Sequence, residues 1–351
     1  MELTGRVTSI DPARSPRRSL SELIRSRADG ILLFGITPPK VGATPERMAE
    51  IAEVTLRRLA PLDLDGLILY DIDDESERVD EDRPFPYLPT VDPARFATGY
   101  LAGWLRPLIV YRCVGKYTEV ELAHWLASAS PSDLLTVFVG ASSSSQPVRT
   151  DLSSAQALRR SVRPEILLGA VTITERHTTR GDEHLRMIAK QASGCAFFVS
   201  QVVYDVDATR TLLSDYAGSC ADRGIAPLPV IFTLSICGSL KTLEFLEWLG
   251  VVVPRSLEHD LRCATDPLSV SLDQCRRAAD DLLRFGRRLG VPVGFNVESV
   301  SIRKVEIEAA VTLAGQLRTL LDDGAVADSG PGSRASSATR SSAWSADRES
   351  R

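Results

Sequence analysis

Four polar side chains stand where long apolar runs of the sequence end. Glu175 and His177 follow one such run, Gln201 lies near the end of the next, and Glu298 lies near the end of the last. Carboxylate, imidazole and carboxamide groups at strand ends can move protons or hydrogen bond to a polar ring. These residues are therefore candidates for a small-molecule site.

Three of these residues also have a purely structural interpretation. His177 can be a hydrogen-bonded structural residue, Gln201 a core amide bonded to backbone, and Glu298 a salt-bridged barrel carboxylate. On the functional side, a carboxyl at an apolar strand end has a raised pKa, so Glu298 could donate a proton near neutral pH. The sequence leaves both interpretations open.

An acidic stretch beginning at Asp71 leads into a loop rich in proline and aromatic residues. A run of charges is usually a solvated loop. The alternative is that Tyr70, Asp71 or Asp73 lines the mouth of a pocket that this loop covers.

Eight apolar runs alternate with helix-patterned segments along the chain. The runs begin near residues 31, 64, 107, 134, 165, 195, 228 and 291. They are near-continuous in Val, Ile, Leu and Phe, which is typical of parallel strands covered by helices. Eight such pairs predict a single (β/α)₈ TIM barrel of the α/β class. A dinucleotide-binding open sheet is disfavoured, because the turn GITPPKVG after the first strand lacks the glycine fingerprint.

We expect three regions along the chain. Residues 1–16 are polar and irregular, and the barrel occupies residues 17–324 with an extra N-terminal helix near Ser19 to Arg27. The segment 325–351 is rich in Ser, Ala and Arg and predicts a disordered tail, because it cannot bury enough apolar surface.

Composition narrows the class of protein. The formal net charge is -5 without a basic stripe, so we expect no nucleic-acid partner. No apolar run is long enough to span a membrane and no signal pattern precedes the first helix, so a cytoplasmic protein without membrane contact is expected. The six cysteines and four histidines show no metal-ligand spacing, and no metal is expected. The sequence leaves assembly into a homo-oligomer open.

Three motifs in order carry a family resemblance. The motif ITERH lies at the end of the fifth expected strand, KQASGC at the end of the next helix, and VSQVVYD at the end of the sixth strand. A shorter motif, PPK, follows the first strand. In this order they resemble the methylenetetrahydrofolate reductase family. The resemblance implies a flavoprotein of one-carbon metabolism and methionine biosynthesis that reduces 5,10-methylenetetrahydrofolate to 5-methyltetrahydrofolate with NADH or NADPH.

The resemblance also implies roles for individual residues. Gln201 falls where the family pairs a carboxamide with the pterin. The family's substrate-binding arginine corresponds to Ile302 or, with a one-residue shift, to Arg303. The positions that would hold FAD are Gly140, Glu175, His177, Glu183, Arg186 and Lys190.

Four family positions are not kept. The catalytic glutamate of the family corresponds to Gly35, and flavin-contacting residues correspond to Val110, Val139 and Ala141. Glu298 is the candidate to replace the missing acid. Hydride could then pass through bound flavin or directly from the nicotinamide. The alternatives are a folate-binding barrel that does not reduce its ligand and another one-carbon enzyme that transfers a methyl group.

Overall fold

The computed structural model describes residues 18–74, 81–129, 134–140 and 147–328, with side chains up to residue 324. Eight parallel strands form a closed barrel in which each strand pairs with the next and β8 pairs with β1. The strands are β1 (Leu32–Ile36), β2 (Gly66–Leu69), β3 (Leu108–Cys113), β4 (Leu134–Val139), β5 (Leu168–Thr172), β6 (Phe197–Val202), β7 (Val230–Ser235) and β8 (Val293–Glu298). The predicted (β/α)₈ barrel is confirmed.

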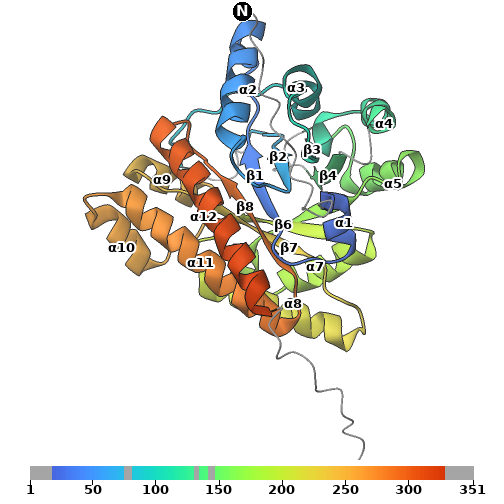
Figure 1. Ribbon diagram of the computed structural model, residues 1–351. Coiled ribbons are helices and arrows are strands. Elements are labelled where there is room, and N and C mark those ends of the chain that lie inside the picture. The colour runs from blue at the N-terminus through green and yellow to red at the C-terminus, as the bar shows by residue number, and fades with distance from the viewer. Residues whose placement is uncertain (1–17, 75–80, 130–133, 141–146, 329–351) are drawn as a thin grey trace, which may run out of the picture.

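Helices surround the barrel and connect successive strands (Figure 1). In the first half they are α1 (Leu20–Arg25), α2 (Pro45–Leu59), α3 (Pro93–Tyr100), the short 3₁₀ helix η1 (Val114–Lys116), α4 (Glu119–Ser128) and α5 (Leu152–Val162). In the second half they are α6 (Thr174–Arg180), α7 (Glu183–Ala192), α8 (Val206–Asp222), α9 (Leu240–Trp248), α10 (Arg255–Cys263), α11 (Pro267–Leu289) and α12 (Lys304–Asp328).

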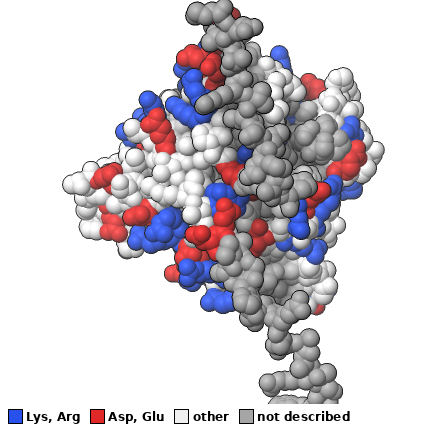
Figure 2. Space-filling view, viewed as in Figure 1, with Lys and Arg blue, Asp and Glu red and all other residues white. Residues whose placement is uncertain are grey.

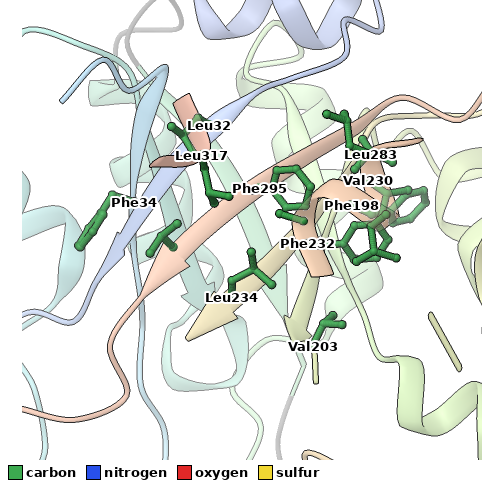
Figure 3. Close-up of a cluster of buried hydrophobic side chains, with 14 of the residues drawn as sticks. Leu32, Phe34, Phe198, Val203, Val230, Phe232, Leu234, Leu283, Phe295 and Leu317 are labelled. Atoms are coloured by element: carbon green, nitrogen blue, oxygen red, sulfur yellow. The ribbon is translucent and has the colours of Figure 1, made fainter. Parts of the chain in front are cut away.

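The strands bury both of their faces, as their near-continuous apolar sequences require. One face packs against the helices, and Figure 3 shows Phe198 and Phe232 beside Val230 and Leu283 of α11. The other face fills the barrel interior with branched side chains such as Leu33. Complete burial of a side chain of this size stabilises the fold by about 1.5 to 3 kcal/mol.

The predicted N-terminal helix closes the amino end of the barrel. Ser19 caps α1 in a capping box with Glu22, which fixes where the helix begins. Leu20 and Ile24 then pack into the interior cluster. The opposite end, where the strands finish, is the mouth of the barrel.

The segment after β5 differs from its prediction as a polar loop, because it forms the helix α6. The sequence TERHTTR has no apolar period, and its three threonines have low helix propensity, so pattern alone does not reveal the helix. Gly181 ends the helix with φ 71, and a contact from His177 to α8 anchors it.

Three helix bounds also differ from the sequence expectation. The helix α10 was not predicted, since it buries little more than Leu257 and Leu261, and α11 begins five residues before the expected Leu272. The last helix extends to Asp328, seven residues beyond its expected end at Leu321. The expected irregular segment 1–16 and residues 329–351 lie outside the described part of the chain.

Two surface properties follow from the composition. Within the described residues, no helix combines the length and apolar character that a membrane crossing requires. On the face drawn in Figure 2, basic and acidic side chains are interspersed, in keeping with 41 basic and 46 acidic residues.

Candidate ligand site at the barrel mouth

A cluster of polar and aromatic side chains lies inside the mouth, between β8 and β2. Asn296 is fully buried and donates from Nδ2 to the Tyr70 hydroxyl at 2.8 Å and to Thr233 Oγ1 at 3.3 Å. The ring of Tyr70 meets that of Tyr111 edge to face, with 5.0 Å between centroids. Tyr70 thus packs within this buried cluster, and its place at a pocket mouth stays a prediction.

Glu298 lies beside this cluster at the end of β8. Burial raises its pKa to about 7, even though the neighbouring polar groups of Tyr70 and Asn296 act in the opposite direction. The same burial, together with the nearby Glu298 carboxylate, raises the pKa of Tyr70 well above its usual value. In the described part of the chain, Glu298 Oε2 and Asn296 Oδ1 are buried without a hydrogen-bond partner.

Two unpartnered acceptors in one cluster are unusual, because a buried polar atom left unpaired costs about 1 to 3 kcal/mol. Both are oxygens, so the matching ligand is a group with neighbouring N–H donors. Because both atoms are buried, such a ligand reaches them only after the groups that cover them move aside.

Gly35 on β1 stands at the position that the reductase resemblance gives to a catalytic glutamate. A Cβ atom at this position would lie 2.8 Å from Tyr70 Cε2 and 3.2 Å from the carboxamide of Asn296. The space that a longer side chain would need is thus occupied by Tyr70 and Asn296. An acidic group at the mouth comes instead from β8.

Gln201 lies where the register between β6 and β7 shifts, between Val199 and Val202. Its Nε2 donates to the Leu249 carbonyl, just after α9, at 2.7 Å, and the side chain is partly buried. The amide nitrogen of Gln201 is therefore bonded to backbone, as the structural interpretation expects. Its role toward a pterin stays a prediction.

Glu183 and Lys190, both expected at a flavin, hold α7 to β5. Glu183 has a fully buried side chain that accepts from the Ile173 amide at 3.2 Å and from Arg176 at 3.0 Å. Lys190 donates to the Val171 carbonyl at 2.6 Å and lies 3.5 Å from Glu183. Burial lowers the pKa of Lys190.

The other residues expected at a flavin contact different parts of the chain. Arg186 is paired with Asp182 on the exposed side of α7. Glu175 accepts from the Val252 amide at 3.3 Å, while the buried His177 ring faces Asp215 of α8. Gly140 follows β4, and a Cβ there would meet none of the described atoms within 4 Å.

The two cationic side chains of this set have carboxylate neighbours within the chain, and Lys190 shares its neighbour Glu183 with Arg176. Arg186 pairs with Asp182 and Lys190 lies against Glu183. The FAD assignment thus stays a sequence-based prediction.

Arg303 lies just before α12, with its side chain about half exposed at 48%. Its guanidinium bonds to the buried Glu306 at 2.9 Å and to the Gly238 carbonyl at 3.4 Å. Glu306 also accepts from Thr242 of α9. Arg303 therefore joins the loops after β7 and β8, and a contact with substrate stays a prediction.

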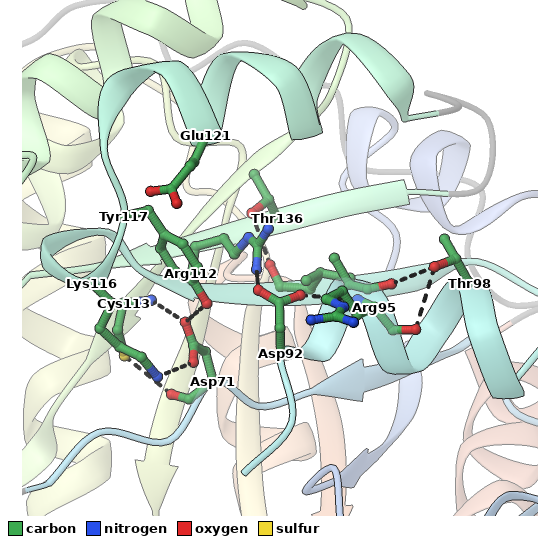
Figure 4. A network of polar contacts seen from close by, with 12 residues as sticks. Asp71, Asp92, Arg95, Thr98, Arg112, Cys113, Lys116, Tyr117, Glu121 and Thr136 are labelled. Atoms are coloured by element: carbon green, nitrogen blue, oxygen red, sulfur yellow. Dashed lines mark hydrogen bonds and ion pairs between the residues drawn. The ribbon is translucent and has the colours of Figure 1, made fainter. Parts of the chain in front are cut away.

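A second polar network fills the mouth at β2 and β3 (Figure 4). Asp71 is buried and accepts from the Cys113 amide at 2.9 Å, from Lys116 Nζ at 2.6 Å and from the Tyr117 hydroxyl at 2.9 Å. Beside it, Arg112 bonds to Asp92 and stacks on Tyr117. The acidic stretch thus begins with a buried anchor, while Asp74, Glu81 and Asp82 are exposed, as expected of a solvated loop, and residues 75–80 lie outside the described part of the chain.

Sequence reasoning missed Asn296 as a site residue. A signal was present, because Asn296 and Glu298 are two apart in GFNVES and side chains two apart share one face of a strand. Two polar residues on one face of a buried strand indicate an internal polar cluster.

No model of a known protein family matches this sequence, and neither does any curated protein. Two solved structures with 12% identity are oxaloacetate acetylhydrolase with oxalate, at a TM-score of 0.41 over 79% of this chain and 78% of that one, and 2,3-dimethylmalate lyase, at a TM-score of 0.42 over 91% and 88%. At these values they add nothing about function.

One solved structure is much more similar. It is an uncharacterized protein from Clostridium thermocellum that binds two copies of 5-methyl-5,6,7,8-tetrahydrofolic acid, with 41% identity and a TM-score of 0.76. The match covers 86% of this chain and 99% of that one. The resemblance to methylenetetrahydrofolate reductases is not tested by this match, but identity at this level over nearly the whole of the other chain shows that the protein belongs to the same family as the Clostridium thermocellum protein.

Proposed function

We propose that the protein binds a reduced folate of the 5-methyltetrahydrofolate type at the barrel mouth. The observation that carries this proposal is the pair of buried acceptors without partners, Glu298 Oε2 and Asn296 Oδ1, among the described residues. The ligand of the Clostridium thermocellum relative supplies the chemical class.

A pterin has the donors that these acceptors lack. Its ring carries an N–H and an exocyclic amino group side by side, and a carboxylate accepts from such a pair in a bidentate manner. Glu298 would accept these two hydrogen bonds, and Asn296 Oδ1 would accept a further one. The hydrogen bonds from Asn296 to Tyr70 and Thr233 hold its carboxamide in a fixed orientation, which lowers the entropy cost of binding.

Binding would favour the ionised form of Glu298. A protonated carboxyl presents one donor and fewer acceptor sites to a ligand edge that is itself a donor. Since the pKa of Glu298 is raised to about 7, affinity should increase as the pH rises from 6 to 8. The expected change is up to about tenfold for each pH unit below the pKa.

A second candidate function is reduction of the methylene derivative by a nicotinamide, as the reductase resemblance implies. Hydride would pass from NADH or NADPH to the methylene carbon as its bond to N10 breaks, and Glu298 would give its proton to N10. The raised pKa of Glu298 supports this role, because a general acid works best with a pKa near the working pH.

The first experiment is a calorimetric titration of the full chain with 5-methyltetrahydrofolate. We expect saturable binding, with a stoichiometry of one or two, and affinity in Glu298→Gln weaker by about tenfold to a hundredfold, as expected when a charged acceptor loses its charge. Glu165→Gln is the matched control, because Glu165 is a half-exposed carboxylate just before β5, at the opposite end of the barrel. Absence of binding in the native chain, or equal affinity in both variants, would remove the proposal.

A second measurement separates binding from reduction. The protein is mixed with a reduced nicotinamide, and absorbance of the nicotinamide is followed with and without 5,10-methylenetetrahydrofolate. Oxidation that requires folate and is lost in Glu298→Gln would establish the reductase function. Folate binding without oxidation would leave the binding function alone.

A further inference from the structure

Two histidines and an aspartate from three different helices meet outside the barrel. His177 lies on α6, His184 on α7 and Asp215 on α8, and one ligand atom from each falls within 4.8 Å of the others. His177 Nε2 lies 3.0 Å from Asp215 Oδ2, and the two imidazole rings meet edge to face at 5.2 Å between centroids.

The two rings are incompletely partnered. His177 is buried, with 6% of its surface exposed, and Nδ1 of both His177 and His184 is buried without a hydrogen-bond partner in the described part of the chain. Asp215 has about half of its side chain exposed, at 49%, so the cluster is open to ions from solvent on that side. An incomplete polar cluster with one open side has the character of an ion site.

We propose that His177, His184 and Asp215 bind a divalent transition-metal ion of the Zn²⁺ class. Neutral imidazoles together with one carboxylate are a ligand set that Zn²⁺ uses, with water completing the tetrahedron. The sequence did not reveal the set, because its members lie on three helices and the usual close spacing of ligands is absent.

Binding of an ion requires the three ligand atoms to move closer together, because they now lie within 4.8 Å of one another. Zn²⁺ with ligand bonds of about 2.0 to 2.1 Å places tetrahedral ligand atoms about 3.3 Å apart. The His177 to Asp215 separation of 3.0 Å already meets this, so the movement falls to His184, which is only partly buried. A rotation of its side chain that carries the ligand atom by about 1 to 1.5 Å is enough to reach this tetrahedral spacing.

The position of the site suggests a structural role for the ion. The helix α6 follows β5 directly and α8 follows β6, so a shared ion would join the two units that carry Glu175 and Gln201. It lies outside the barrel, apart from Glu298 and Asn296, and does not depend on the folate proposal.

The test is a Zn²⁺ titration of the full chain after removal of metals by a chelator, with a competing chromophoric indicator. We expect one tight equivalent in the native chain. His184→Ala and Asp215→Asn should each weaken it by at least about a hundredfold, since loss of even an outer-shell partner typically costs 10- to 100-fold. These two variants are preferred to His177→Ala, because removal of a buried ring could unfold the helix.

The matched control is the pair His259 and Cys263, which lie one turn apart on α10 with 3.8 Å between ring nitrogen and sulfur. The double variant His259→Ala, Cys263→Ser should keep the tight equivalent. Zn²⁺ should also raise the melting temperature of the native chain and of this control, but not that of His184→Ala. Equal affinity in His184→Ala and the native chain, or loss of the tight equivalent in the control, would overturn the assignment.

Discussion

Two carboxylates at the same end of the barrel, the buried Asp71 and the partly buried Glu298, have opposite surroundings. Asp71, after β2, has three donors around its carboxylate, including the ammonium of Lys116. Glu298, at the end of β8, has a raised pKa and an oxygen without a partner among the described residues. A carboxylate with all its partners in the chain fixes a loop, whereas one with an open acceptor is suited to a ligand.

The difference arises from the neighbouring residue types. The segment after β3 supplies a backbone amide, a lysine and a tyrosine to Asp71, so its charge is compensated inside the fold. Around Glu298 the neighbours Tyr70, Tyr111 and Asn296 are neutral, so burial acts on the carboxylate without a compensating cation. A sequence search for acidic residues alone would treat the two positions alike.

The largest expected change in stability follows from removal of the Asp71 carboxylate. Asp71→Ala should lower the free energy of unfolding by about 3 to 5 kcal/mol, because it removes the carboxylate that accepts from the Lys116 ammonium, the Cys113 amide and the Tyr117 hydroxyl. The measurement is urea denaturation. Asp207→Ala is the control, since Asp207 is 93% exposed in its pair with Arg210 and should cost at most about 1 kcal/mol. Similar losses in both variants would mean that the Asp71 network does not anchor the loop.

The next effect is a dependence of stability on pH that arises from Glu298. The pKa of Glu298 is raised in the folded state from 4.5 to about 7, so the native chain binds more protons than the unfolded chain between these values. The contribution of Glu298 to the free energy of unfolding is therefore fully present below about pH 4.5. It falls by about 3 kcal/mol as the pH rises from there through 7.

The check is chemical denaturation across this pH range for the native chain and Glu298→Gln. The variant cannot ionise at this position, so its stability should change less between about pH 4.5 and 8. Parallel pH profiles would show that Glu298 titrates normally and would remove the basis for its role as proton donor.

Sequence predicted the barrel well, because eight buried parallel strands leave a strong signal in their continuous apolar runs. It predicted Glu298 for the same reason, since a carboxylate in such a run stands out. It did not predict that Tyr70 and Asn296 fill the space at Gly35, which depends on contacts between β1, β2 and β8. The helix α6 was missed because tertiary contacts, and not an apolar period, define it.

The third effect tests this crowded position. Gly35→Ala should destabilise the fold by about 1 to 3 kcal/mol, because its Cβ would lie 2.8 Å from the Tyr70 ring. Gly140→Ala at the end of β4 is the matched control, since its Cβ would meet no atom of the described residues within 4 Å. Thermal unfolding of both variants gives the difference. A Gly35→Ala chain as stable as the control would show that Tyr70 can move aside at little cost.

The smallest expected effect on stability comes from the Tyr70 hydroxyl, which lies between Asn296 and Glu298 in this cluster. Tyr70→Phe removes the hydroxyl that accepts from Asn296 at 2.8 Å, and Asn296 keeps Thr233 as its other acceptor at 3.3 Å. The expected loss of stability is about 1 kcal/mol. The Tyr70 hydroxyl also lowers the pKa of Glu298, so in the variant the pH at which stability falls should move upward.

This shift distinguishes a site role from simple packing. Tyr100→Phe on α3, where the ring stacks on Phe96, is the control and should leave the pH profile unchanged. If Tyr70→Phe lowers stability equally at every pH, the hydroxyl supports Asn296 alone and does not act on Glu298. A profile that moves upward would instead show that neutral neighbours tune this carboxyl, in the way that a cation compensates Asp71 on the other side of the mouth.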